Sequence, residues 1–147
     1  MELQIQTPVP TAAIERLQAA INAHDLDAMV ACFAPDFVSR QPVHPSRDFN
    51  GSEQVRQNWA VIFAAVPDLR ATLLHKAVSG DVVWAEWEWS GTRRDGQPHE
   101  MRGVTVQGVA EDRLSWANFY MEVVETSGLD VMASIRQAAG AAAGAPR

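Results

Sequence analysis

The side chains best suited to chemistry lie near the end of the sequence. Trp116, Asn118 and Tyr120 alternate within the segment 114–124, so they share one face if that segment is a strand. A tyrosine hydroxyl and an asparagine amide can donate hydrogen bonds to a carbonyl oxygen and polarise it. We therefore predict that this face lines a pocket, with Tyr120 as a candidate catalytic residue. The alternative is that both side chains only satisfy hydrogen bonds of the core.

Arg102 is the second candidate, in the predicted strand 101–109. If the loop 91–98 closes a hairpin near its middle, Arg102 lies opposite Trp87, where a guanidinium over an indole is favourable. The position depends on the register, because a shift of one residue turns a side chain to the other face of the sheet.

His44 is the third candidate, because it follows Gln41-Pro42 in a loop near the expected mouth of the pocket. Histidine exchanges protons near pH 7, so His44 is the best general base that the sequence offers. The alternative is a histidine on a surface loop. Cys32 and the serines lack a neighbouring histidine in sequence, so nothing favours a nucleophilic mechanism.

Tryptophans supply most of the expected apolar wall. In the strand 82–92, Trp87 and Trp89 share one face and Trp84 lies on the other, beside two glutamates. We expect the helices to cover the first face and a second copy of the chain to meet the Trp84 face, giving a homodimer. The predicted ligand pocket consists of Trp59, Phe63, Trp87, Trp89, Val104, Trp116, Asn118 and Gln41.

Composition excludes several classes of function. The net charge is −6 with no basic cluster, which is unlike a nucleic-acid-binding protein. No run of 18 apolar residues could cross a membrane, and no signal peptide is recognisable, so we expect a cytoplasmic protein. No His, Cys or carboxylate spacing predicts a metal site, and no glycine-rich phosphate loop indicates a nucleotide, so we expect no cofactor.

The elements that must position these residues are helices followed by strands. Apolar spacing predicts a helix over 11–23, a short helix between Asp25 and Pro35, and a third from Ser52 to Pro67. Alternation then predicts long antiparallel strands from residue 69 onward. This order indicates an α+β domain, a cone-shaped curved sheet with about three N-terminal helices on its concave face. We assign 1–10 to a lead-in, 11–127 to the domain, and 128–147 to a partly disordered tail.

Three stretches carry a family resemblance: NAHDLDAMVACFAPDF (22–37), VPDLRATLLHKAVSGDVVWAEWEWSGT (66–92) and MRGVTVQGVAEDRLSWANFYME (101–122). In order and spacing they resemble the SnoaL-like branch of the nuclear transport factor 2-like superfamily. The resemblance implies the cone fold and a pocket that is often enzymatic.

The familiar acid and base positions of that superfamily are replaced here. Where ketosteroid isomerase-like proteins have a general base, an oxyanion tyrosine and a protonated aspartate, this chain has Gln41, Leu17 and Arg102. The arginine and two aspartates of limonene epoxide hydrolase-like proteins correspond to Trp87, Trp89 and Asn118. The aspartate of SnoaL-like polyketide cyclases corresponds to Tyr120.

Three functions therefore stay open. The first is a cyclase- or isomerase-type enzyme for a small apolar oxygenated compound, in which Tyr120, Asn118 and Arg102 polarise a carbonyl. The second is a non-catalytic homodimer that binds an apolar small molecule, favoured by the missing carboxylates. The third is a protein-interaction adaptor that uses the tail and the Trp84 face.

Overall fold

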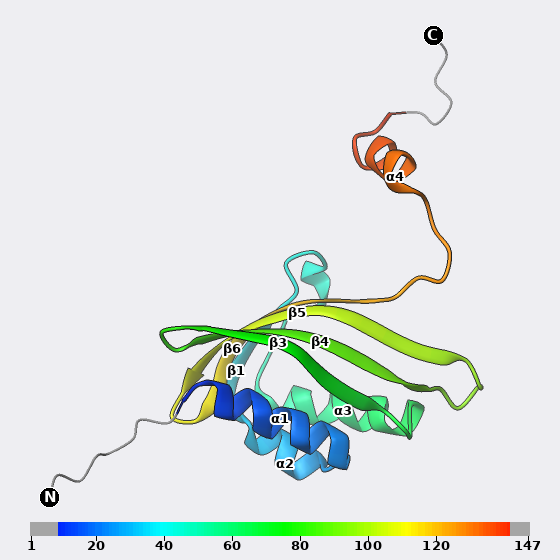
Figure 1. The fold of residues 1–147 in the computed structure, drawn as a ribbon. Helices are drawn as coiled ribbons and strands as arrows, with labels where there is room; N and C mark the ends of the chain where they lie inside the picture. The colour runs from blue at the N-terminus through cyan, green and yellow to red at the C-terminus, as the bar shows by residue number, and fades with distance from the viewer. Residues whose placement is uncertain (1–8, 142–147) are drawn as a thin grey trace, which may run out of the picture.

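A computed structural model describes residues 9–141 and confirms the α+β class. Three helices lie on one side of a curved six-stranded sheet, and a fourth follows the last strand (Figure 1). The helices are α1 (Thr11–Ala23), α2 (Leu26–Ala31), α3 (Ser52–Ala65) and α4 (Val131–Ala138), with a 3-10 turn at Pro45–Arg47. The strands are β1 (Phe33–Arg40), β2 (Phe49–Asn50), β3 (Arg70–Ser79), β4 (Val82–Thr92), β5 (Pro98–Ala110) and β6 (Arg113–Val123).

The sheet has the strand order β2-β1-β6-β5-β4-β3, with antiparallel pairs throughout except β1 and β6, which run parallel. The chain after α2 turns into β1 sooner than the sequence predicts. Phe33 is already in the strand, although the short helix was expected to extend as far as Pro35. A six-residue helix and a strand start at Phe33 bring β1 beside the centre of the sheet.

The alternation of β4 divides the sheet into two sides. Its helix-facing side carries Val83, Ala85, Trp87 and Trp89, all buried against the core. Its open side carries Trp84, which is 51% exposed. We call these the helix-facing side and the open side throughout. A residue of β5 or β6 lies on the same side of the sheet as the residue it pairs with on the neighbouring strand. Among the helices, α1 supplies most of the side chains buried in the core, mainly Ile14, Leu17 and Ile21.

The predicted pairing of Arg102 with Trp87 was wrong. Arg102 pairs with Glu88 on the open side, and Gly103 is the partner of Trp87. The loop between β4 and β5 covers 93–97 and joins Thr92 to Pro98. That loop is centred half a residue later than the midpoint of 91–98, so each partner on β5 moves by one position and Arg102 changes sides.

The predicted inner face of β6 was also wrong. Gly108 pairs with Trp116 and Val109 pairs with Leu114, so Ser115 is an extra, bulged residue. A bulge shifts the following pairs by one residue. Tyr120 therefore pairs with Val104 on the open side, while Phe119 pairs with Thr105 on the helix-facing side. Without the bulge, continued pairing from the turn would have placed Tyr120 inside.

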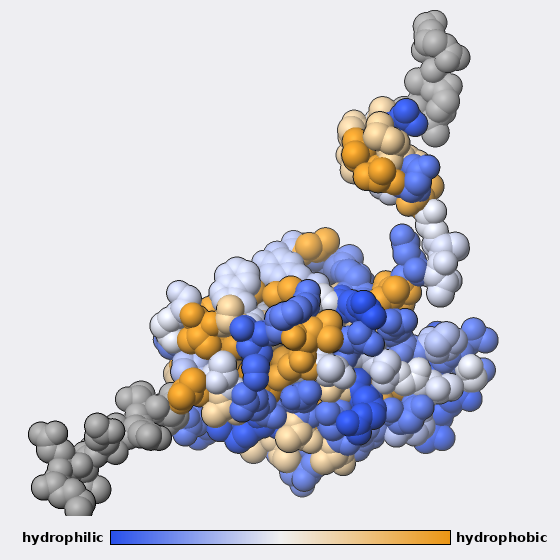
Figure 2. Space-filling view, in the orientation of Figure 1, coloured by the Kyte–Doolittle hydropathy of each residue, from blue (hydrophilic) through white to orange (hydrophobic). Residues whose placement is uncertain are grey.

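The C-terminal segment, assigned to the tail in the sequence analysis, is helical at Val131–Ala138. The side chain of Asp130 caps α4 by accepting a hydrogen bond from the backbone N–H of Ala133. Apolar side chains gather on α4, which stands away from the body of the molecule (Figures 1 and 2). Residues 1–8 of the expected lead-in 1–10 and the last residues of the tail, 142–147, lie outside the described residues. Between residues 9 and 141, no helix has the length and apolarity that a membrane crossing requires.

Candidate functional site

An apolar cavity of about 190 Å³ lies between the helix-facing side of the sheet and the helices. Its walls come from α1, α3, and strands β1, β4, β5 and β6. Most of the wall is aliphatic or aromatic, and five neutral polar side chains interrupt it. Those five are Ser39, Gln41, Asn58, Thr105 and Gln107.

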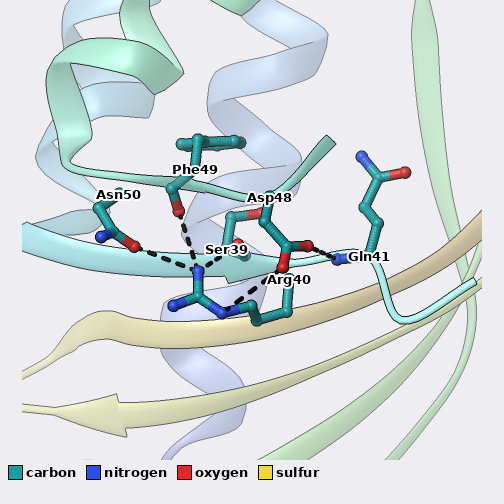
Figure 3. Close-up of polar contacts among 6 residues, drawn as sticks. All are labelled: Ser39, Arg40, Gln41, Asp48, Phe49 and Asn50. Carbon is teal, nitrogen blue, oxygen red and sulfur yellow. Dashed lines mark hydrogen bonds and ion pairs between the residues drawn. The ribbon is translucent and has the colours of Figure 1, made fainter. Parts of the chain in front are cut away.

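The end of β1 positions two of the five polar groups. The Arg40 guanidinium donates to the carbonyls of Ser39 (2.9 Å) and Phe49 (3.5 Å) and to Oδ1 of Asn50 (3.2 Å), tying β1 to β2. Asp48 accepts the backbone N–H of Gln41 at 2.7 Å. Figure 3 shows the Gln41 side chain on the opposite side of the strand from the Arg40 guanidinium. The charged side chain therefore holds the strand from outside while the neutral amide of Gln41 reaches the cavity.

A row of residues crosses the sheet at the floor of the cavity. Val83, Gln107, Ala117 and Ser39 are successive partners on β4, β5, β6 and β1. Nε2 of Gln107 donates to the Val83 carbonyl at 2.8 Å, and Gln107 is 2% exposed. We call Gln107, Ala117 and Ser39 the polar row, after its two outer residues. Their side chains give the cavity hydrogen-bonding atoms on either side of the small methyl group of Ala117.

The other end of the cavity is aromatic. The Trp89 ring packs edge-on against Trp59 and Trp87, with centroids 5.2 and 6.2 Å apart, and near Phe119 at 5.9 Å. Nε1 of Trp87 donates to Oγ1 of Thr105 at 2.9 Å. Nε1 of Trp89 is inaccessible to solvent and has no hydrogen-bond partner within 9–141, in a residue that is 7% exposed. This end supplies ring-stacking surface rather than charge.

The lining within the described chain contains no ionisable side chain. His24 lies behind the wall, where it stacks on Phe63 at 4.6 Å and contacts the Leu69 carbonyl at 2.8 Å. Burial raises the pKa of the Cys32 thiol, which sits outside the lining and donates to the Ala28 carbonyl. The structure between residues 9 and 141 shows no cluster of three potential metal ligands. The cavity can stack, exclude water and donate or accept hydrogen bonds, but its walls carry no general base.

Half of the predicted pocket residues line this cavity. Gln41, Trp59, Trp87 and Trp89 are in its wall. Phe63 packs against Trp59 from behind, with ring centroids 5.5 Å apart. The open side of the sheet holds the remaining three, which the shifted registers of β5 and β6 carry away from the cavity: Val104, Trp116 and Asn118.

The predicted catalytic residues come together on the open side, away from the cavity. Arg102 forms ion pairs with Glu88 (2.9 Å) and Glu100 (3.5 Å), and it pairs across the sheet with Glu122. Nε2 of His44 contacts Oε1 of Glu122 at 2.5 Å. Tyr120 is 41% exposed on the same side. The sheet separates this charged surface from the cavity, so these residues do not act on a molecule inside it.

Sequence reasoning missed several wall residues. Thr105 and Gln107 alternate with the residues that we placed inside, so the correct register would have found them. Phe119 was assigned to the outer face of β6 for the same reason. Ser39 lies in a segment that we took as a short extended piece, and Asn58 is one residue from Trp59 on α3. The signal in the sequence that could have indicated these wall residues was a polar residue within an otherwise apolar segment.

Solved structures with the same fold include several SnoaL-like proteins. A loop-truncation variant of IdmH is 26% identical, covering 78% of this chain and 93% of that one, with a TM-score of 0.66. Wild-type IdmH from Streptomyces antibioticus, a proposed polyketide cyclase, is 24% identical over the same shares, with a TM-score of 0.69. A proposed SnoaL-like polyketide cyclase from Jannaschia sp. CCS1 is 21% identical, covering 90% of this chain and 95% of that one, with a TM-score of 0.67. No match was found among curated proteins.

The match to a family model agrees with the structural comparison and with the resemblance in the sequence. Residues 14–116, from the first buried turn of α1 to the bulge of β6, match the model of the SnoaL-like domain. That range contains all five neutral polar groups of the cavity wall. The chain belongs to the SnoaL-like domain family of the nuclear transport factor 2-like superfamily.

Proposed function

We propose that the cavity binds one small, uncharged, largely apolar ring compound that carries oxygen. The observation that supports this is a wall of aromatic and aliphatic side chains interrupted only by neutral polar groups. A dry cavity of about 150 Å³ is large enough for benzene, and this one is about 190 Å³. Drug-sized ligands use larger pockets, of about 300 Å³ or more. One or two fused rings is therefore the size class.

Calorimetric titration with toluene, cyclohexanone and phenol tests this proposal. Binding should disappear in Ala117→Leu or the milder Ala117→Val, because Ala117 lies in the cavity wall and a larger side chain occupies the space. The matched control is Ala77→Leu, which adds the same atoms to the open side beside Trp84. Failure of all three compounds to bind the folded wild-type protein would contradict the proposal.

A cyclase- or isomerase-type reaction is the second candidate, supported by structural relatives described as polyketide cyclases. The amides of Gln41 and Asn58 and the hydroxyls of Ser39 and Thr105 can orient a substrate, and water would then carry the proton. Tyr120→Phe and Arg102→Met are the controls, because both residues lie on the open side. If either variant lowers turnover tenfold or more, the reaction takes place on the open side and not in the cavity.

We also propose that the open side is covered by a second copy of this chain. Trp84 and Tyr120 are half exposed there, and Val104 lies between their positions in the register. The same surface holds the Arg102 cation and the Glu86, Glu88 and Glu122 carboxylates, so two copies can pair opposite charges. Sedimentation velocity should show a dimer that Trp84→Glu converts to a monomer. A monomeric wild-type protein at micromolar concentration would contradict this.

A further inference from the structure

The orientation of one buried amide restricts which oxygen group the cavity accepts. Nε2 of Gln107 donates to the carbonyl oxygen of Val83, and a carbonyl oxygen can only accept. This contact fixes the amide, so its nitrogen faces β4 and Oε1 is the atom with free lone pairs. Gln107 is 2% exposed and lines the cavity, so an occupant is the nearest source of a donor for that oxygen.

Ser39 completes the same row from the other side. Gln107 and Ser39 are separated by β6, and neighbouring strands are about 4.8 Å apart, so the two positions are roughly 10 Å apart. The residue between them is Ala117, whose methyl group leaves the floor open. A ring seated over Ala117 therefore lies beside Gln107, whereas Ser39 lies at the far end of the row.

We infer that the cavity selects a hydroxyl-bearing ring, with its O–H donating to Oε1 of Gln107. The ring then lies toward Trp59 and Trp89, in the aromatic end of the cavity. This inference rests on the proposed function and adds the chemical class of the ligand: a phenol, an enol or a cyclic alcohol.

Other oxygen and nitrogen groups fit the row less well. A ketone or ether has no proton for Oε1 of Gln107, so that acceptor would stay unpaired in a buried site. A carboxylate would face the same acceptor without any cation in the described lining. An ammonium ion could contact the tryptophan faces, but it would be buried without a carboxylate among those wall residues.

The test compares phenol, anisole and toluene, which share a ring and differ in the donor. Calorimetric titration should give phenol about 5- to 10-fold tighter binding than toluene, the effect of one net hydrogen bond, and anisole close to toluene. Gln107→Met keeps the length of the side chain and removes the acceptor, so it should bring phenol to the affinity that toluene has in the same variant.

Each result has a distinct meaning. Equal affinity for phenol and toluene in the wild-type protein overturns the inference and leaves the proposed function standing. A phenol preference that survives in the folded Gln107→Met variant, checked by circular dichroism, also overturns it. Tetramethylammonium displacing toluene points to a cation site and overturns it. If none of the ring compounds binds, the proposed function and the inference fail together.

Discussion

Trp84 and Trp87 lie three residues apart on β4, on opposite sides of the sheet. The polar groups around Trp87 are neutral, whereas charged side chains surround Trp84. Around Trp87 the polar partners are neutral, such as the hydroxyl of Thr105. Around Trp84 the neighbouring positions carry ion pairs, such as His75 with Glu86. Aromatic content therefore does not distinguish the cavity side of the sheet from the open side. The two sides differ in whether the polar groups beside the aromatic rings are neutral or charged.

Truncating the two tryptophans should give the largest contrast. Trp87→Ala removes a fully buried side chain and should cost about 3–5 kcal/mol in the free energy of unfolding. Trp84→Ala removes a half-exposed one and should cost less than about 1 kcal/mol in the monomer. Urea denaturation at low protein concentration measures both. Similar losses for the two variants would break the distinction between the sides.

The two glycines of β5 offer a second contrast. Gly103 has a φ of +152°, and a Cβ there would meet the backbone of Tyr120 and Met121. Since backbone cannot move aside, Gly103→Ala should cost about 2–3 kcal/mol. At Gly108 a Cβ would meet the Trp116 indole on the open side, and a side chain can swing away. We expect about 1 kcal/mol or less for Gly108→Ala by thermal unfolding, and an equal cost would contradict this account.

A finer contrast lies within the helix-facing side. Trp87→Phe breaks the hydrogen bond to Thr105, whereas Trp89→Phe removes an N–H that has no partner in the described chain. Both lose similar apolar area. Trp87→Phe should therefore be the more destabilising by about 1 kcal/mol. Chemical denaturation of the two purified variants decides it, and a greater loss for Trp89→Phe would show that its N–H has a partner after all.

The smallest expected effect concerns pH. Burial lowers the pKa of His99, near the start of β5, below its ordinary value of 6.5. Protonation then favours the unfolded state, so stability is full above pH 6.5 and falls as the pH drops through the lower folded-state pKa. His99→Gln should flatten this part of the curve of stability against pH.

Toluene affinity should stay constant from about pH 5 to 8, because no ionisable group lines the cavity within 9–141. An affinity that changes with pH would contradict the neutral lining.

Much of the fold could be predicted from local patterns. Helical spacing located α1 and α3, and alternation identified which residues of β4 face the helices. The burial of Trp87 and Trp89 follows from that alternation. Trp59 reaches the cavity from α3, which helical spacing predicted, and Gln41 reaches it from the position directly after β1.

The failures concern relations between strands. Assigning β6 requires the bulge at Ser115, and the sequence there, Leu-Ser-Trp, carries no glycine or proline to mark it. Assigning Arg102 requires the length of the 93–97 loop to the nearest residue. Each error is a single residue, but in a sheet a single residue exchanges the two sides. Half of the predicted pocket residues therefore line the cavity, and none of the three predicted catalytic residues does, although the long strands themselves were predicted.

The detachment of α4 from the body has a consequence for exchange kinetics. An isolated eight-residue helix is marginal in water, because nucleation is costly and tertiary packing normally supplies the stability. Amide protons of Val131–Ala138 should then exchange with solvent at nearly the rate of a short peptide, while those of β4 and β5 wait for global unfolding. Slow exchange in α4 would reveal that a surface covers its apolar face in solution, and the concentration dependence of that protection would tell whether the surface belongs to another copy.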